Sequence, residues 1–137
     1  IPSTQVVCSS AFYQSRPLVP PGTSSDHIPW YMNIVCAMQT KLDPFELLYW
    51  LQWIEKRMGR NRVKKWESRI IDLDILAYDR LICKKSQLTL PHPEMHLRPF
   101  VLKQLCEIDP HWIHPVLGVS AFALAEKIAG QIKKWEL

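Results

Sequence analysis

The sequence contains no apolar run that approaches the roughly 20 residues needed to cross a membrane. Its amino end shows no charged segment followed by an apolar one, which is the pattern of an export signal. It also lacks internal repeats and low-complexity tracts. These absences argue against a membrane protein, an exported protein and a repeat protein. We therefore expect a cytoplasmic protein without a membrane partner.

Cysteine is scarce, and its spacing fits no metal or redox motif. Cys8, Cys36, Cys83 and Cys106 are scattered and include no C-x-x-C pair. A chain of 137 residues, 47% of them hydrophobic, can build a core without disulfides. We expect free, mostly buried thiols in a reducing compartment, and a single folded domain over residues 1–137.

Basic residues are concentrated in one part of the chain. Seven of the 17 lysines and arginines lie between Lys56 and Arg69, where Glu67 is the one acidic residue. Such a cluster can follow a nucleic-acid backbone, form a solvated loop, or surround the oxygens of one polyphosphate. We favour the polyphosphate because two candidate metal ligands follow directly.

Those ligands interrupt an apolar run, Arg69-Ile-Ile-Asp72-Leu-Asp74-Ile-Leu76, whose β-branched residues predict a strand. Residues i and i+2 of a strand point to the same face, with β-carbons roughly 6.5–7 Å apart. Carboxylates at this spacing suit a pair of magnesium ions better than zinc. A bare D-x-D also occurs on the solvated face of edge strands. Aspartate is a poor strand former, however, and two in one apolar strand favour a function.

The remaining pattern predicts a mixed fold. Apolar, β-prone stretches predict strands over residues 4–14, 30–40 and 81–83. Helical periodicity predicts helices over residues 43–59, 98–108 and 120–136. The first helix opens with a capping box, Asp43-Pro44-Phe45-Glu46, and ends at Gly59. The order predicts an α+β fold, compatible with a ferredoxin-like split βαβ sandwich with additional C-terminal helices.

Several motifs follow one another in a recognisable order: Ala11-Phe12-Tyr13 with Pro17-Leu18, Tyr31-x-Asn33, Gly59-Arg60-x-Arg62, Trp66-x-x-Arg69-x-x-Asp72-Leu-Asp74-Ile, Leu90-Pro91-His92-Pro93 with Met95, Arg98-x-Phe100, Ile108-x-Pro110-x-Trp112 and His114-Pro115. In these motifs the chain resembles the 6-hydroxymethyl-7,8-dihydropterin pyrophosphokinase family of folate biosynthesis over nearly its whole length.

Members of this family transfer the terminal diphosphate of ATP to the hydroxymethyl group of the reduced pterin and release AMP. The resemblance implies the same reaction here, with ATP as co-substrate and two Mg²⁺ ions held by Asp72 and Asp74. Catalysis would rest on positioning and charge neutralisation rather than on a nucleophilic side chain. The catalytic arginines of the family match Arg60, Arg62 and Arg69.

The resemblance also implies binding residues for both substrates. The ATP site of the family matches Gln52, Glu55, Lys65, Ile75, Leu88, Thr89, His92 and Arg98. The pterin would lie between the rings of Tyr31 and Phe100. Its remaining contacts would come from Ser15, Arg16, Pro17, Leu18, Asn33 and Trp66.

The family begins with a central strand, a glycine-serine-asparagine turn and a helix, and this sequence matches none of them. Without a central strand, sheet edges would be unpaired and apolar surface exposed. We therefore expect an N-terminal segment ahead of Ile1; the alternative is a shortened, inactive chain.

Two other interpretations of function stay open at this point. One is a non-catalytic module that binds nucleotide or nucleic acid through the basic cluster, and the other is a pterin-binding pseudoenzyme. We favour an enzyme that acts on small molecules as a monomer and has no nucleic-acid partner. It would be fused to or associated with a dihydropteroate synthase, or act alone.

Overall fold

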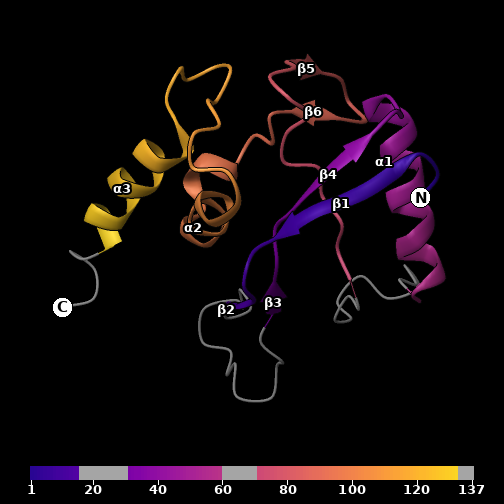
Figure 1. Cartoon of the computed structure of the whole chain (residues 1–137), viewed down its shortest axis with the longest axis horizontal. Coiled ribbons are helices and arrows are strands. Elements are labelled where there is room, and N and C mark those ends of the chain that lie inside the picture. Colours follow the sequence, from indigo (N-terminus) through magenta and orange to yellow (C-terminus); the bar gives the residue numbers. More distant parts are fainter. Residues whose placement is uncertain (16–30, 60–70, 133–137) are drawn as a thin grey trace.

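The computed structural model describes residues 1–15, 31–59 and 71–132. Over these residues the chain forms three antiparallel pairs of strands and three α-helices, which confirms the α+β class (Figure 1). The strands are β1 Thr4–Ser9, β2 Tyr13–Ser15, β3 Tyr31–Asn33, β4 Cys36–Thr40, β5 Cys83–Lys84 and β6 Thr89–Leu90. The helices are α1 Pro44–Arg57, α2 Pro99–Ile108 and α3 Ala121–Ile132, with a 3₁₀ turn, η1, at Met95–Leu97. None of these helices is long and apolar enough to span a bilayer.

The two long strands predicted over residues 4–14 and 30–40 are each broken in two. The β1–β4 ladder ends where Ser9 faces Cys36, and the β2–β3 ladder resumes where Tyr13 faces Asn33. Between these pairs three residues face two, and this excess of one interrupts regular pairing. The hairpin therefore has a break in its backbone ladder, and the predicted continuous strands are wrong at this point.

Helix α1 begins as the sequence predicts. Asp43 is its N-cap: the Asp43 side chain accepts a hydrogen bond from the Glu46 amide at 2.8 Å, and the Glu46 side chain accepts one from the Asp43 amide at 3.3 Å. The bond from the Glu46 amide holds the pKa of Asp43 below its ordinary value. At the other end Met58 is the C-cap, and Gly59 follows with a φ of 89°, a conformation that favours glycine.

A core cluster lies between α1 and the chain that follows it. Leu47 and Leu51, one turn apart on α1, are buried together with Ile75, Leu88 and Leu90. Burial of apolar surface is the main favourable term in folding. It therefore fixes the segment that carries the two aspartates, and the connection that carries His92, against the same helix.

Residues 71–77 do not form the strand that the sequence predicts. In the described part of the chain no strand pairs with this segment. The Leu73 amide instead donates to the buried Glu55 carboxylate at 3.0 Å, and the Leu76 carbonyl accepts from the His92 amide at 2.7 Å. Burial still alternates as it would in a strand: residues 71, 73 and 75 are covered, whereas Asp72 and Asp74 are exposed.

Two smaller predictions also need correction. Cys8 and Cys36 are exposed free thiols rather than buried ones, because both lie on hairpin strands that are largely solvent-accessible in the described structure. The short strand expected at residues 81–83 lies at Cys83–Lys84. The two later helices are confirmed as α2 and as α3, although residues 133–137 lie outside the described chain.

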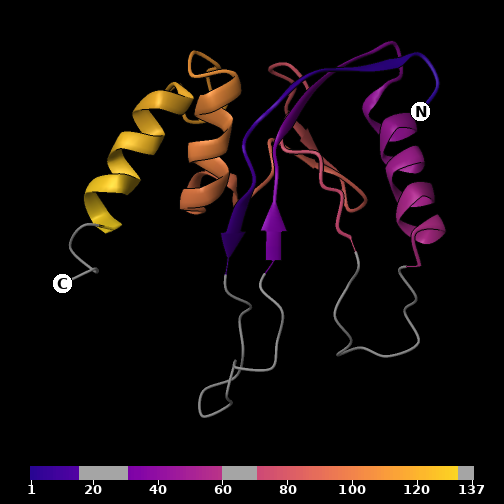
Figure 2. The ribbon, with the colours of Figure 1, turned by 60° about the horizontal axis from the view of Figure 1, so that its bottom comes forward.

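Helices α2 and α3 lie side by side (Figure 2). Leu102 of α2 and Ala121 of α3 are fully buried. The loop before α3 is closed by His114, whose Nδ1 accepts hydrogen bonds from the amides of Val116 at 3.2 Å and Leu117 at 3.1 Å. Burial, together with the neighbouring His96, lowers the pKa of His114, so its neutral form is the one that the fold requires.

This arrangement predicts a loss of stability in acid. The pKa of His114 is lower in the folded state than the unfolded-state value of 6.5. Neutral His114 therefore stabilises the fold above pH 6.5, and this stabilisation is lost as the pH falls below that value. We expect the free energy of unfolding, measured with urea, to fall between about pH 7 and about pH 5. The free energy of unfolding should change less with pH in His114→Asn, because the asparagine side-chain oxygen can accept from the same backbone amides without titrating. An unchanged slope in that variant would contradict the assignment.

The Glu55 bond to the aspartate segment predicts a second stability effect. Glu55 is 5% exposed, so Glu55→Ala leaves the Leu73 amide without its acceptor in a buried place. We expect a loss of about 1–3 kcal/mol in the free energy of unfolding. Glu55→Gln keeps an oxygen acceptor and should cost less. Urea denaturation compares the two, and equal losses would count against this role for the carboxylate.

Candidate functional site

The exposed carboxylates of Asp72 and Asp74 lie on the same side of residues 71–77, because the alternate residues turn toward the core. Carboxylate oxygens are the hard ligands that magnesium prefers. No group of three or more histidine, cysteine or acidic side chains suited to a metal occurs among the described residues. A pair of carboxylates fits an ion that takes its other ligands from water and a substrate, which is how proteins commonly hold magnesium.

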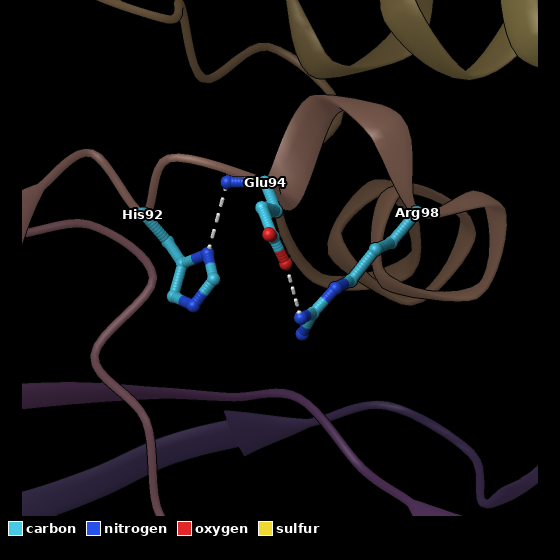
Figure 3. A network of polar contacts seen from close by, with 3 residues as sticks. All are labelled: His92, Glu94 and Arg98. Carbon is cyan, nitrogen blue, oxygen red and sulfur yellow. Dashed lines mark hydrogen bonds and ion pairs between the residues drawn. The ribbon is translucent and has the colours of Figure 1, made fainter. Parts of the chain in front are cut away.

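His92 lies close enough to Asp74 to respond to its charge. Partial burial lowers the pKa of His92, the Asp74 carboxylate opposes that shift, and the Arg98 guanidinium adds to it. The ring Nδ1 accepts a hydrogen bond from the Glu94 amide at 3.2 Å (Figure 3). The imidazole is therefore neutral near pH 7, with its Nε2–H as a donor.

Arg98 stands at the N-cap of α2, directly after η1. Its Nη2 lies 2.6 Å from Oε2 of Glu94, and both side chains are exposed (Figure 3). A guanidinium offers a planar set of donors that matches phosphate, and an exposed ion pair is weak enough to be exchanged for another anion. His92, Glu94 and Arg98 thus form one polar group, whose His92 ring lies within electrostatic range of Asp74.

A second group of predicted residues lies where α2 meets the hairpin. Asn33, in β3, is half-buried, and its Nδ2 donates to the Tyr13 carbonyl at 3.4 Å. Phe100, in the first turn of α2, is 48% exposed. An exposed aromatic ring can stack on a flat ligand, and an amide can pair with the polar edge of one.

Sequence reasoning missed two residues of α2 that hold this region. Gln104 is fully buried, and its Nε2 donates to the carbonyls of Ala11 at 3.2 Å and Asn33 at 2.7 Å. Glu107 accepts from the Ala11 amide at 2.9 Å and from the Tyr13 hydroxyl. The latter bond raises the pKa of Tyr13 and lowers that of Glu107. Glutamine and glutamate are usually surface residues in a helix, so only the tertiary contacts reveal their role.

The other residues predicted to line the ATP site have different surroundings. Ile75 and Leu88 are buried in the core cluster with α1. Gln52 and Thr89 are exposed, and the Glu55 carboxylate faces the Leu73 amide. In the described structure His92 lies within electrostatic range of both Asp74 and Arg98, whereas Ile75 and Leu88 belong to the buried core.

Many predicted site residues lie outside the residues that the structure describes: Arg16, Pro17, Leu18, Arg60, Arg62, Lys65, Trp66 and Arg69. The side chains of Ser15 and Tyr31 also lie outside the description, although their backbones belong to β2 and β3. The roles of these ten residues stay predictions.

Comparison with known proteins gives a consistent result. The family model for 7,8-dihydro-6-hydroxymethylpterin-pyrophosphokinase matches residues 1–110. A 2-amino-4-hydroxy-6-hydroxymethyldihydropteridine pyrophosphokinase from Synechocystis sp. is 40% identical over 121 residues, which are 88% of this chain and 58% of the relative. The protein of the same name from Haemophilus influenzae is 42% identical over 113 residues, 82% of this chain and 68% of the relative.

A longer relative matches as well. The folic acid synthesis protein fol1 of Pneumocystis carinii is 41% identical over 128 residues, which are 93% of this chain and 17% of that protein. The chain thus spans between about a sixth and about two thirds of the length of these three relatives. With a family match over residues 1–110 and about 40% identity across most of its length, the chain belongs to the 7,8-dihydro-6-hydroxymethylpterin-pyrophosphokinase family.

Proposed function

We propose that this protein transfers the terminal diphosphate of ATP to the hydroxymethyl group of 6-hydroxymethyl-7,8-dihydropterin and releases AMP. The observation that supports this most directly is the pair Asp72 and Asp74, exposed on one side of a segment whose other side is anchored in the core. The names of the relatives from Synechocystis and Haemophilus influenzae agree with it.

Magnesium is the cation that this site suits. Asp72 and Asp74 would hold Mg²⁺, two ions in the proposed complex, together with phosphate oxygens of the nucleotide. When bound, such ions neutralise phosphate charge as it develops in the transfer. The two carboxylates would position that charge, and both are exposed.

The nucleotide phosphates would be contacted by nearby donors. Two of these donors would be the Nε2–H of neutral His92, which lies within electrostatic range of Asp74, and the guanidinium of Arg98, which lies near His92. Arg60, Arg62, Lys65 and Arg69 are proposed as further phosphate contacts because the basic cluster directly precedes the aspartates in sequence. No general base is required, since orientation and charge neutralisation supply most of the rate enhancement in this type of transfer.

The reduced pterin would bind between β3 and α2. Phe100 and Tyr31 are proposed to stack on the two faces of its ring, and Asn33 to pair with its polar edge. Ser15, Arg16, Pro17, Leu18 and Trp66 are proposed to complete the enclosure. The exposure of Phe100 and the position of Asn33 beside the same helix support this half of the site.

The edge of β4 that pairs with no described strand supports a larger sheet around this site. In the described residues β4 pairs only with β1, residues 71–77 pair with no strand, and Val6, Val7 and Met38 of the hairpin are exposed. We propose that a further strand pairs beside β4 and completes a ferredoxin-like sheet within one pyrophosphokinase domain. A dihydropteroate synthase, fused or associated, is the proposed partner; the match to one sixth of a folic acid synthesis protein supports it.

The metal ligands provide the principal test of the reaction. Asp72→Asn and Asp74→Asn should each lower the rate of AMP formation from ATP, magnesium and the hydroxymethyl dihydropterin by at least about a hundredfold. Asp79→Asn removes the same charge from an exposed turn five residues past Asp74 and should leave the rate within about twofold. Chromatography separates AMP from ADP. Formation of ADP instead of AMP would show that a different phosphate bond is cleaved.

The exposed ion pair predicts an effect on nucleotide binding. Glu94 competes with phosphate for the Arg98 guanidinium, so Glu94→Gln should tighten the dissociation constant of magnesium–ATP by up to about fivefold. Arg98→Gln should weaken it. Isothermal titration at low and high salt measures both, and the gain in Glu94→Gln should shrink as salt rises. Weaker binding in Glu94→Gln would contradict a competing role for this carboxylate.

A further inference from the structure

The break in the hairpin leaves backbone groups that the ladder does not satisfy. Ser10 bridges one side of it: its amide donates to the Val35 carbonyl at 2.8 Å, and its Oγ accepts from the Val35 amide at 3.0 Å. The carbonyls of Ala11 and Asn33 are both turned to Gln104, whose Nε2 donates to each of them. The two N–H groups of one side-chain amide thus join the two strands where their own pairing stops.

The burial of Gln104 makes these bonds consequential. The side chain is 0% exposed, so water cannot replace either bond if the amide is removed. Glu107, three residues later on α2, holds the same part of the hairpin through the Ala11 amide and the Tyr13 hydroxyl. Residues three and four apart share one face of a helix. One face of α2 therefore fixes the backbone around Asn33 from both strands.

The same helix carries Phe100, four residues before Gln104. Phe100 is exposed toward solvent, whereas Gln104 is buried against the Asn33 carbonyl at 2.7 Å. A single turn of α2 thus connects the ring proposed to stack on the pterin with the backbone of the residue proposed to read its edge. The separation of these two groups is set by one rigid element.

We propose that Gln104 is a positioning residue for the pterin: it holds the backbone of Asn33 so that the Asn33 amide and the Phe100 ring keep one fixed relation. This proposal rests on the proposed function, because it takes Asn33 and Phe100 as contacts of the heterocycle. Gln104 touches neither substrate. It acts through the Asn33 carbonyl, and its effect falls on pterin binding and not on the nucleotide.

The test replaces Gln104 with methionine, which has a similar length and no N–H donors. The dissociation constant of 6-hydroxymethyl-7,8-dihydropterin is measured with magnesium and a non-hydrolysable ATP analogue at saturation, and that of the analogue is measured alone. Gln104→Met should raise the dissociation constant of the pterin about tenfold and change that of the ATP analogue by less than about twofold. Equal weakening of both ligands, or no change in pterin binding, overturns the proposal.

A double-mutant cycle separates positioning from general damage. In an Asn33→Ala background, Gln104→Met should weaken pterin binding by less than about a further twofold, because the group it positions is gone. Additive effects overturn the proposal. Leu102→Ala, which removes a fully buried side chain from the same helix, is the matched control. Leu102→Ala should lower the free energy of unfolding but leave the dissociation constant of the pterin unchanged. If it weakens pterin binding as much as Gln104→Met does, the role of Gln104 is merely structural.

The unmutated chain gives a test that does not depend on folding of the variants. The side-chain amide resonances of Gln104 in an NMR spectrum should shift when the pterin is added to the complex with the ATP analogue, and not when the analogue is added alone. Absence of the pterin-dependent shift overturns the proposal. If the unmutated chain binds the analogue but no pterin, the proposed function fails with it. If it binds both and Gln104→Met behaves as the unmutated chain does, only the role of Gln104 fails.

Discussion

The hydrogen bond from the Leu73 amide to the Glu55 carboxylate joins α1 to the segment that carries the two aspartates. In the described residues no strand pairs with that segment, so its backbone is held by side chains and loops instead of by a ladder. Glu55 supplies one support, and the His92 amide supplies another at the Leu76 carbonyl. Leu47, Leu51 and Ile75 pack in the core next to this segment. The exposed acidic pair is therefore carried by a backbone that close packing holds in position.

The proposed site has two ends, an acidic end at Asp72 and Asp74 and an aromatic end at Asn33 and Phe100, and they depend on different parts of the chain. The acidic end is supported by α1, the core cluster and the connection around His92. The aromatic end is supported by α2, which contacts the broken hairpin through Gln104 and Glu107. Arg98 at the N-cap of α2 and Phe100 in its first turn place one residue of each end within a short stretch of chain. A shift of α2 would therefore affect both ends together.

Local chemistry was enough to predict several features of the fold. The capping box of α1, the positions of α2 and α3 and the α+β class follow from short-range patterns, and all are confirmed. The shared exposure of Asp72 and Asp74 follows from the period of two along an extended chain. The break in the hairpin could not be predicted in this way, because it depends on a one-residue excess between two strands far apart in sequence.

The same limit applies to the site. His92 and Arg98 were predicted from the family resemblance. His92 lies within electrostatic range of Asp74 and of Arg98, and the contacts of both residues with a nucleotide stay predictions. Strand assignment at residues 71–77 failed because β propensity cannot supply a pairing partner. Gln104 was missed because a glutamine in a helix is normally solvated, and only contact with Ala11 and Asn33 explains its burial.

The contacts of α2 with the hairpin join residues that are very far apart in the chain. The bond between Ala11 and Glu107 spans 96 positions, whereas the bond between Glu55 and Leu73 spans 18. Closing a long loop costs more entropy and slows folding. During synthesis on a ribosome the acidic end can therefore begin to assemble early. The hairpin of β1 to β4 cannot make its contacts with α2 until that helix is synthesised, almost a hundred residues after β1. Throughout that interval its apolar strands are accessible to chaperones.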